Sequence, residues 1–219
     1  MNDVANATSR QAERKSGAVV YLDASSREVC RLSFSNALIT EVGFPALEAG
    51  QNEPAIMTVR LTCASTRRHR DSAGRTYNLN PNRGPSWLVS SFRLNLDGLG
   101  ETTSRTVRIE ELIVRGPNPG SLAVPDLVIT FPASSGQPME AWLEDFVIKG
   151  NNGDAQKKSG TLEWLSPDLR EVFGTLSFEH LGIHRLDPVM FDTGNRTLHL
   201  LQAQMYCENL RLEPHPAWG

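Results

Sequence analysis

Along much of this 219-residue chain, apolar residues stand at every second position. Phe92, Leu94 and Leu96 alternate with polar neighbours, and residues 57–63 repeat the pattern. A period of two places alternate side chains on opposite faces, as in a half-buried strand. Turn signals such as Asp97-Gly98 separate these runs, so the sequence predicts a mainly β protein. The further strand candidates are residues 18–22, 107–114, 127–131, 161–165, 174–178 and 200–207.

One segment departs from this period. Its apolar residues fall at i, i+3, i+4 and i+7, namely Met139, Trp142, Leu143 and Phe146. That spacing forms one stripe on a helix, and Pro138 suits the first turn of such a helix. We expect a short amphipathic helix near residues 138–148 that packs on a sheet.

Composition excludes several classes of protein. Lys and Arg number 22 and Asp and Glu 25, so the net charge of −3 does not favour nucleic acid or anionic lipid. No apolar run approaches the roughly 20 residues that span a bilayer, and the first 16 residues are too polar for a secretory signal. Cys30, Cys63 and Cys207 cannot all pair within one chain, and none lies in a C-x-x-C motif. We therefore expect a reduced, cytoplasmic protein that does not insert into a membrane.

An internal repeat narrows the architecture further. An aromatic-Leu pair followed by Arg-Glu-Val occurs at residues 21–29 and again, shifted by 143 positions, at residues 164–172. Leu-Ser-Phe at residues 32–34 recurs at residues 176–178, shifted by 144, and Cys63 aligns with Cys207. We predict a duplicated β unit, in which segments 17–63 and 160–207 share one strand arrangement and the two cysteines face equivalent interiors.

The residues with catalytic potential do not form a recognisable site. His180 and His184 have a spacing that binds zinc on a helix, but they follow a strand and flank a glycine. On a strand these positions lie about 13 Å apart, so surface histidines are the better interpretation. The cysteines occupy apolar slots, and adjacent Glu144 and Asp145 suit a solvated helix face. We predict no enzyme, no metal and no cofactor.

The first repeat also resembles a known family. Residues 18–29, 32–42 and 45–61 resemble the C-terminal half of the tail tube proteins of contractile phages and phage-tail-like injection systems. Residues 89–213 resemble a whole tube domain, with an opening strand around Phe92, the helix around Trp142 and the closing repeat. The resemblance implies an antiparallel β-barrel or sandwich with one helix, stacked in sixfold or pseudo-sixfold rings. It also implies self or homologous tube subunits, sheath or baseplate proteins as partners.

The resemblance divides the chain unequally. It gives a polar N-terminal tail (1–16), a partial tube-like unit (17–66), a basic linker loop (67–87), a tube-like domain (88–214) and an irregular tail (215–219). The first unit lacks the N-terminal half of a tube domain. Either the chain carries about one and a half domains, or a neighbour supplies the missing strands. A cap, tube-initiator or baseplate-hub subunit fits as well as a tube subunit does.

The basic segment is the main candidate for a contact surface. Between residues 60 and 83 the chain has six arginines and one aspartate. This segment is either a solvated loop or a surface that meets an acidic neighbour; its Arg67–Arg70 run has no interleaved aromatic residue for nucleic-acid stacking. The candidate assembly contacts are Arg67, Arg68, Arg70, Arg75, Glu140, Glu144 and Asp145.

The sequence leaves two classes of function open. The favoured class is a structural subunit that joins its neighbours through sheet edges. The alternative is a carbohydrate-binding β-sandwich, in which Trp87, Trp142 or Trp164 would stack on sugar rings.

Overall fold

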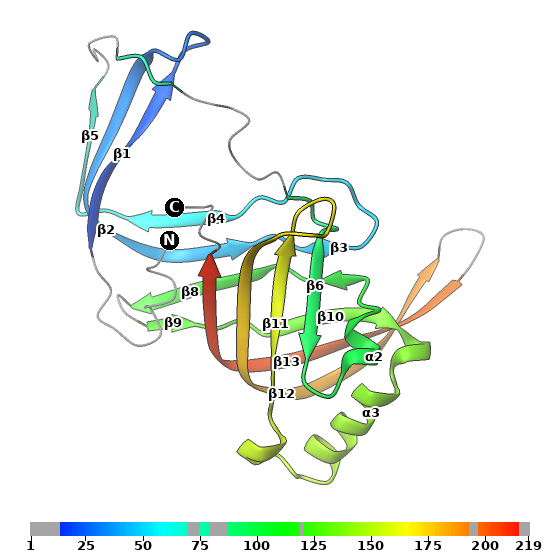
Figure 1. Cartoon of the computed structure of the whole chain (residues 1–219). Coiled ribbons are helices and arrows are strands. Elements are labelled where there is room, and N and C mark those ends of the chain that lie inside the picture. Colours follow the sequence, from blue (N-terminus) through cyan, green and yellow to red (C-terminus); the bar gives the residue numbers. More distant parts are fainter. Residues whose placement is uncertain (1–13, 70–74, 79–86, 119–120, 193–196, 215–219) are drawn as a thin grey trace.

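The computed structural model describes residues 14–69, 75–78, 87–118, 121–192 and 197–214. Two antiparallel sheets make up most of this part of the chain, so the predicted mainly β architecture is confirmed (Figure 1). One sheet contains β1 (Lys15–Leu22), β2 (Glu28–Phe44), β4 (Thr58–Thr62), β5 (Ser65–His69), β8 (Leu112–Asn118) and β9 (Ser121–Ala123). The other contains β3 (Leu47–Glu48), β7 (Arg108–Ile109), β10 (Leu127–Pro132), β13 (Thr197–Pro214), β12 (Val172–Asp192), β11 (Lys158–Leu165) and β6 (Phe92–Leu96), in this spatial order.

Helical structure is short and lies beside the second sheet (Figure 1). The predicted helix is α3 (Gln137–Leu143), which continues as a π-helical turn over Glu144–Ile148. A second helix, α2 (Gly100–Thr103), follows β6, and 3₁₀ turns occupy Ala133–Ser135 and Asp154–Gln156. No helix in the described ranges has the length and hydropathy needed to cross a membrane.

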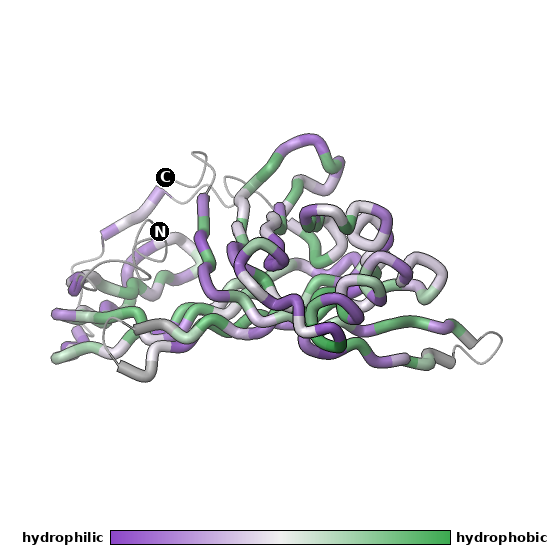
Figure 2. The backbone as a smooth tube through the Cα atoms, turned by 90° about the horizontal axis from the view of Figure 1, so that it is seen from below, coloured by the Kyte–Doolittle hydropathy of each residue, from purple (hydrophilic) through white to green (hydrophobic). Residues whose placement is uncertain are grey.

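Alternation along the strands builds one hydrophobic core, as the alternating colours of the strands in Figure 2 illustrate. Its most buried members come from both sheets and include Phe44, Leu47, Phe131, Trp164 and Phe178. The helix adds Met139, Trp142 and Phe146, the positions of the predicted stripe. Trp142 also donates a hydrogen bond through Nε1 to the carbonyl of Gln156, at 3.3 Å. The helix is therefore fixed to the sheet by packing and by one polar contact.

The predicted duplication is confirmed by the pairing of the strands. In the first copy Val19 pairs with Leu32 and Tyr21 with Cys30; in the second Leu162 pairs with Leu176 and Trp164 with Gly174. The agreement continues on the far side of the central strand, where the pairs Ile39–Leu61 and Ile183–Met205 correspond. Every β-bulge in the first copy has a counterpart at the same place in the second.

The backbone conformations of the two copies agree as well. Ser26 and Leu169 occupy the same turn position, with φ values of 59° and 60°. Asn36 and His180 occupy the same bulge position, with φ values of 49° and 56°. A non-glycine residue seldom adopts this left-handed region, so the shared values show that both copies form the same turn and the same bulge.

The predicted linker 67–87 needs a correction. Arg67, Arg68 and His69 belong to strand β5, which pairs with residues 31–35 of β2. The segment lacks alternating apolar residues, but backbone hydrogen bonds do not depend on side-chain type and hold it in the sheet. The duplicated unit consequently extends beyond residue 63, since β4 and β5 together correspond to the single long strand β13. Residues 70–74 and 79–86 of the linker, most of the N-terminal tail and the tail 215–219 lie outside the described residues.

A hairpin extends from the second sheet on the side opposite the first copy (Figure 1). It is formed by the ends of β12 and β13, which remain paired as far as Asp192 and Thr197. Met190 and Leu198 leave apolar surface exposed on it. The same two strands run through the core, so the hairpin is a direct extension of the core sheet.

We predict that Trp142→Ala lowers the free energy of unfolding by about 3–5 kcal/mol, because it removes a large buried side chain and a hydrogen bond. Denaturant titration followed by circular dichroism measures this quantity. Val147→Ala, at a half-exposed position of the same helical segment, is the control and should change stability by less than about 1 kcal/mol. A comparably small effect for Trp142→Ala would contradict the burial of the apolar helix stripe in the core.

Candidate assembly surfaces

The first copy of the repeat has two parts because β2 is long and pairs with different strands along its length. Residues 28–37 pair with β1 and β5, and we call these strands together the arm. Residues 38–44 pair with β4 and β8, and β4 with this part of β2 is called the base. The arm extends away from the remainder of the molecule (Figure 1), whereas Val42 and Phe44, at the end of β2 in the base, are buried in the common core.

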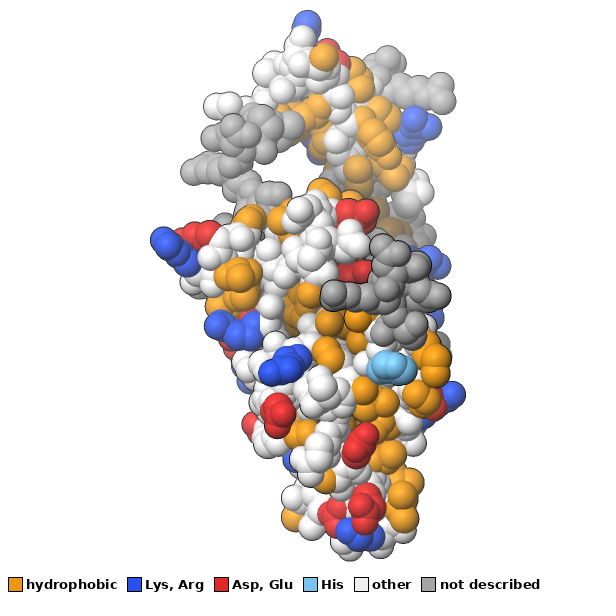
Figure 3. Space-filling model, turned by 90° about the vertical axis from the view of Figure 1, so that its right-hand side faces the viewer, with side chains coloured by type: hydrophobic (Ala, Val, Ile, Leu, Met, Phe, Trp, Pro, Cys, Tyr) orange, Lys and Arg blue, Asp and Glu red, His pale blue; other side chains and the backbone are white. Residues whose placement is uncertain are grey.

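Apolar side chains that are buried in the second copy are exposed in the first. Val19 is 48% exposed and its counterpart Leu162 is 1% exposed; Tyr21 is 50% exposed and its counterpart Trp164 is 1% exposed. In the strand register Glu28 pairs with Leu22 and Val172 with Leu165, so the next residue, Val29 or Phe173, occupies the same place in each copy; Val29 is exposed and Phe173 is buried. Figure 3 shows hydrophobic side chains at the surface of the arm, at the top of the view. Val19 and Tyr21 thus alternate along β1 as the residues of a core strand do, but they leave an apolar surface exposed.

The edges of the two copies differ in the same way. In the second copy the outer edge of β11 pairs with β6, from Gly160 with Leu96 to Trp164 with Phe92. In the first copy the equivalent edge of β1, from Gly17 to Leu22, has no partner strand among the described residues. An unpaired edge exposes backbone N–H and C=O groups that can pair with another chain.

The base has a second edge of this kind. Residues 200–205 of β13 pair on their outer side with β10, and β4 is the counterpart of this part of β13. Within the described ranges β4 pairs with β2 alone. The side chains of Val59 and Leu61 are 53% and 41% exposed, whereas their counterparts Ala203 and Met205 are fully buried.

The predicted basic residues lie on or beside the arm. Arg67 and Arg68 are on β5, and Arg68 donates a hydrogen bond from Nε to Cys30 Sγ at 3.3 Å, which raises the pKa of the arginine. Arg75 lies beside the turn between β1 and β2, where its carbonyl accepts a hydrogen bond from the Glu28 amide at 2.9 Å. Arg70 is outside the described residues. The guanidinium groups of the described members are exposed, so the arm has a basic border.

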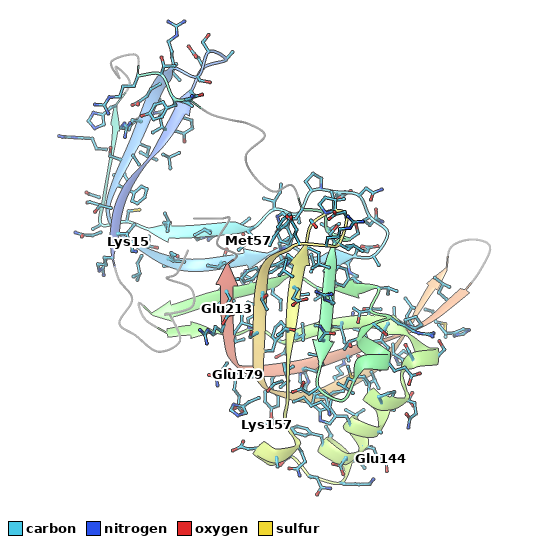
Figure 4. All side chains as sticks on the ribbon, viewed as in Figure 1. Lys15, Met57, Glu144, Lys157, Glu179 and Glu213 are labelled. Carbon is cyan, nitrogen blue, oxygen red and sulfur yellow. The ribbon has the colours of Figure 1, made fainter. Side chains whose placement is uncertain are left out.

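The predicted acidic residues lie on the helical segment, at the end of the molecule opposite the arm. Glu140 is exposed on α3, and Glu144 is 3.0 Å from Lys149 Nζ. Asp145 accepts a hydrogen bond at 2.8 Å from the side-chain amide of Asn151. Figure 4 places Lys15, near the base of the arm, far from Glu144 on the helical segment. The two charged sets therefore do not meet within one chain.

The histidines have separate carboxylate neighbours. His184 Nε2 is 2.8 Å from Asp126 Oδ2, and His180 Nδ1 is 3.7 Å from Glu208 Oε2. Across the described ranges no three His, Cys, Asp or Glu side chains are grouped so that they could hold a metal ion. The two histidines do not converge on a common point.

The cysteines differ in burial, which corrects the predicted equivalence of Cys63 and Cys207. Cys207 is buried, whereas Cys63 is partly exposed, because strands cover the second copy and leave the first uncovered. Burial raises the pKa of the Cys207 thiol to about 11, and the thiol donates hydrogen bonds to the carbonyls of Glu179 and Asn209. Cys207 is thus a neutral thiol at physiological pH.

Three tryptophans that could have bound sugar rings are buried instead. Trp164 stacks on Phe44 with ring centroids 5.3 Å apart, and Trp87 meets its edge at the same distance. Trp142 packs against Phe146 at 6.0 Å, and all three indole side chains are buried. None of them presents a face to a ligand in solution.

The two unpaired edges of the first copy were not among the predicted contact residues. One feature of the sequence could have indicated the edge of β1: residues 1–16 contain no alternating apolar run like that of residues 92–96. The edge of β4 has no such signal, because the missing counterpart of β10 is seen only in the strand pairing of the described residues.

The chain matches no protein-family model and no curated protein. Several solved structures match at low identity. Hcp1 from the E. coli EAEC 042 pathovar is 18% identical, with 57% of this chain and 92% of that chain covered and a TM-score of 0.39. The tube-terminating cap of the anti-feeding prophage is 12% identical, with 92% and 97% covered and a TM-score of 0.30. The sheath-tube complex of an extracellular contractile injection system, PVC, matches at 14% identity, with 57% and 88% covered and a TM-score of 0.33.

We predict that an alkylating reagent at mildly alkaline pH labels Cys63 faster than Cys207 in the folded protein. The reagent reacts with the thiolate, which a raised pKa and burial both suppress at Cys207. Mass spectrometry of peptides after timed quenching measures the two rates, and labelling in denaturant is the control that makes them equal. Equal rates in the folded protein would contradict the burial of Cys207.

Proposed function

We propose that this protein is a structural subunit of a contractile, phage-tail-like particle. In this role it forms or caps the inner tube, or joins the tube to the baseplate, by assembling with its neighbours into a ring. We further propose that assembly takes place in the cytoplasm and uses the edges of the β-sheets. The role is structural and not catalytic.

The observation that carries the proposal is the difference between the two copies of the repeat. One copy is covered by other strands of its own chain, whereas the other keeps the same register but has unpaired edges and exposed apolar side chains. Such edges are a liability in a monomer, since they promote uncontrolled association. In a closed ring every subunit covers the same edges of its neighbour, and no free edge remains.

The type of particle is inferred from the sequence. Residues 18–61 and 89–213 resemble the tail tube proteins of contractile systems, which assemble as stacked rings. A partial tube-like unit beside a complete one suits a subunit at an end of the tube, such as a cap or a hub, at least as well as a repeating tube subunit. Sixfold or pseudo-sixfold symmetry belongs to this proposal.

The alternative function, carbohydrate binding, has less support. It requires an aromatic side chain exposed on one face, and Trp87, Trp142 and Trp164 are buried. The large hydrophobic side chains that are exposed on the arm are Val19, Tyr21 and Val29, which includes a single aromatic residue. A structural role accounts for this surface without a further ligand.

We expect electron micrographs of the purified full chain to contain closed rings, because the unpaired edges recur on every copy. Light scattering over a range of protein concentrations measures the accompanying increase in mass. A glycan array probed with the same preparation tests the alternative. A monomer at all concentrations that binds a glycan would replace the structural proposal.

We also expect the arginines of the basic segment to promote association. Changing Arg67, Arg68, Arg70 and Arg75 to Gln should leave the chain folded and weaken assembly, because a basic border can meet the acidic helix of the next subunit. Exposed pairs contribute only about 0–1 kcal/mol each, so the effect depends on several acting together. Added salt should weaken assembly of the unmutated protein in the same way.

A matched control changes four exposed arginines to Gln: Arg93, Arg185 and Arg211 on strands of the second sheet and Arg170 in the turn between β11 and β12. This variant loses the same net charge but keeps the arm. Light scattering at low and high salt compares the two variants. If both assemble as the parent does at every salt concentration, the arginines are only a solvated border.

A further inference from the structure

Comparison of the two copies shows which neighbouring strands the first copy lacks among the described residues. Both copies have a central strand with a hairpin partner on one side and a longer partner on the other. The second copy has two further strands, β6 outside β11 and β10 outside β13. The first copy has neither in the described part of the chain, so two outer edges remain, one on β1 and one on β4.

The strand outside β11 has a particular chemistry. β6 places Phe92, Leu94 and Leu96 at alternate positions, and these side chains face the core beside Trp164 and Leu162. A strand of the same type beside β1 would cover Tyr21 and Val19, the counterparts of that pair. The edge of β1 therefore fits a short strand with large apolar residues at every second position.

This chain has such a strand with its apolar side chains exposed. β4 has the sequence Thr-Val-Arg-Leu-Thr, in which Val59 and Leu61 alternate with polar residues. Both apolar side chains are more than two-fifths exposed, and the outer edge of β4 is unpaired among the described residues. Arg60 lies on the opposite side of the strand, and its guanidinium Nη2 is 3.5 Å from Oε1 of Glu41 on β2. β4 is thus an ordered strand with one apolar face available.

The two edges also have the right geometry for joining identical chains. β1 pairs with one side of β2, and β4 and β5 pair with its other side, as β11 and β13 lie on either side of β12. The free edges of β1 and β4 therefore face in opposite directions and cannot pair with each other within one chain. Two different surfaces of one subunit that fit each other form a head-to-tail contact, which can close into a ring.

We propose that β4 of one copy of this chain pairs with β1 of a second copy, so that the sheet continues from subunit to subunit and buries Val59 and Leu61 against Val19 and Tyr21. The inference rests on the proposed assembly into rings and adds which strands form the contact. It identifies the neighbour that supplies a missing strand as a second copy of the same chain. In this contact β1 of the second copy lies beside β4, in the position that β10 has beside β13.

Hydrogen exchange of the full-length parent protein tests the contact without any substitution. Amides of residues 17–22 and 58–62 should exchange at least about tenfold more slowly in the associated state than in a dilute monomer, because intermolecular backbone hydrogen bonds protect them. Amides of β9, which lies at the other end of the first sheet, should not change. Protection of only one of the two strands would overturn the pairing of β1 with β4.

Three matched substitutions give an independent test. Val19→Asp and Val59→Asp should each weaken self-association by about 100-fold or more, because each buries an unpaired carboxylate in the contact. Val147→Asp, at a helical position with the same 48% exposure as Val19, should leave it unchanged. Circular dichroism establishes that each variant is folded, and analytical ultracentrifugation measures association.

The outcomes separate this contact from the proposed function. If the parent forms rings and the Val19→Asp and Val59→Asp variants assemble as the Val147→Asp variant does, the proposed β1–β4 contact is wrong and the structural role stands. If the parent remains a monomer at every concentration, self-assembly fails and this contact fails with it. Selective loss in the Val19 and Val59 variants, together with protection of both strands, supports the contact.

Discussion

The stack of Phe44 on Trp164 joins the two copies of the repeat and determines how the chain is arranged. Phe44 is the last residue of β2 in the first copy, and Trp164 lies on β11 in the second. Their rings are nearly parallel, with an interplanar angle of 13°, and both side chains are 1% exposed. Because this contact holds the end of β2 in the core, the other end of the same strand has to extend outwards as the arm.

Sequence reasoning predicted the elements that depend on local pattern. The repeat could be recognised in the sequence because both copies form the same turn and the same bulge. In the turn, Ser26 and Leu169 share a positive φ. The helix was visible because Met139, Trp142 and Phe146 share one face. These features depend on spacing along the chain, which a single sequence records.

The features that the sequence did not predict depend on neighbours in space. Val59 and Leu61 have the alternation of a half-buried strand, yet they are exposed because no strand among the described residues covers them. Strand β5 was not recognised because Arg67 and Arg68 lack the alternation, although their backbone pairs with β2. Apolar alternation indicates a surface that can be covered, but it does not specify which chain covers it. Comparison of the two copies in three dimensions identified which strand edges have no partner among the described residues.

The continuous course of β12 and β13 has a mechanical consequence. The two strands are paired from Gly174 and Pro214 at one end to Asp192 and Thr197 in the extended hairpin at the other. A sideways force on the hairpin would have to bend both strands together, because backbone hydrogen bonds join them along this length. Only the bulge between Ile183 and Arg185 interrupts the regular pairing of these two strands. A sideways displacement of the hairpin would therefore be transmitted to the core, so the hairpin is a stiff lever attached to it.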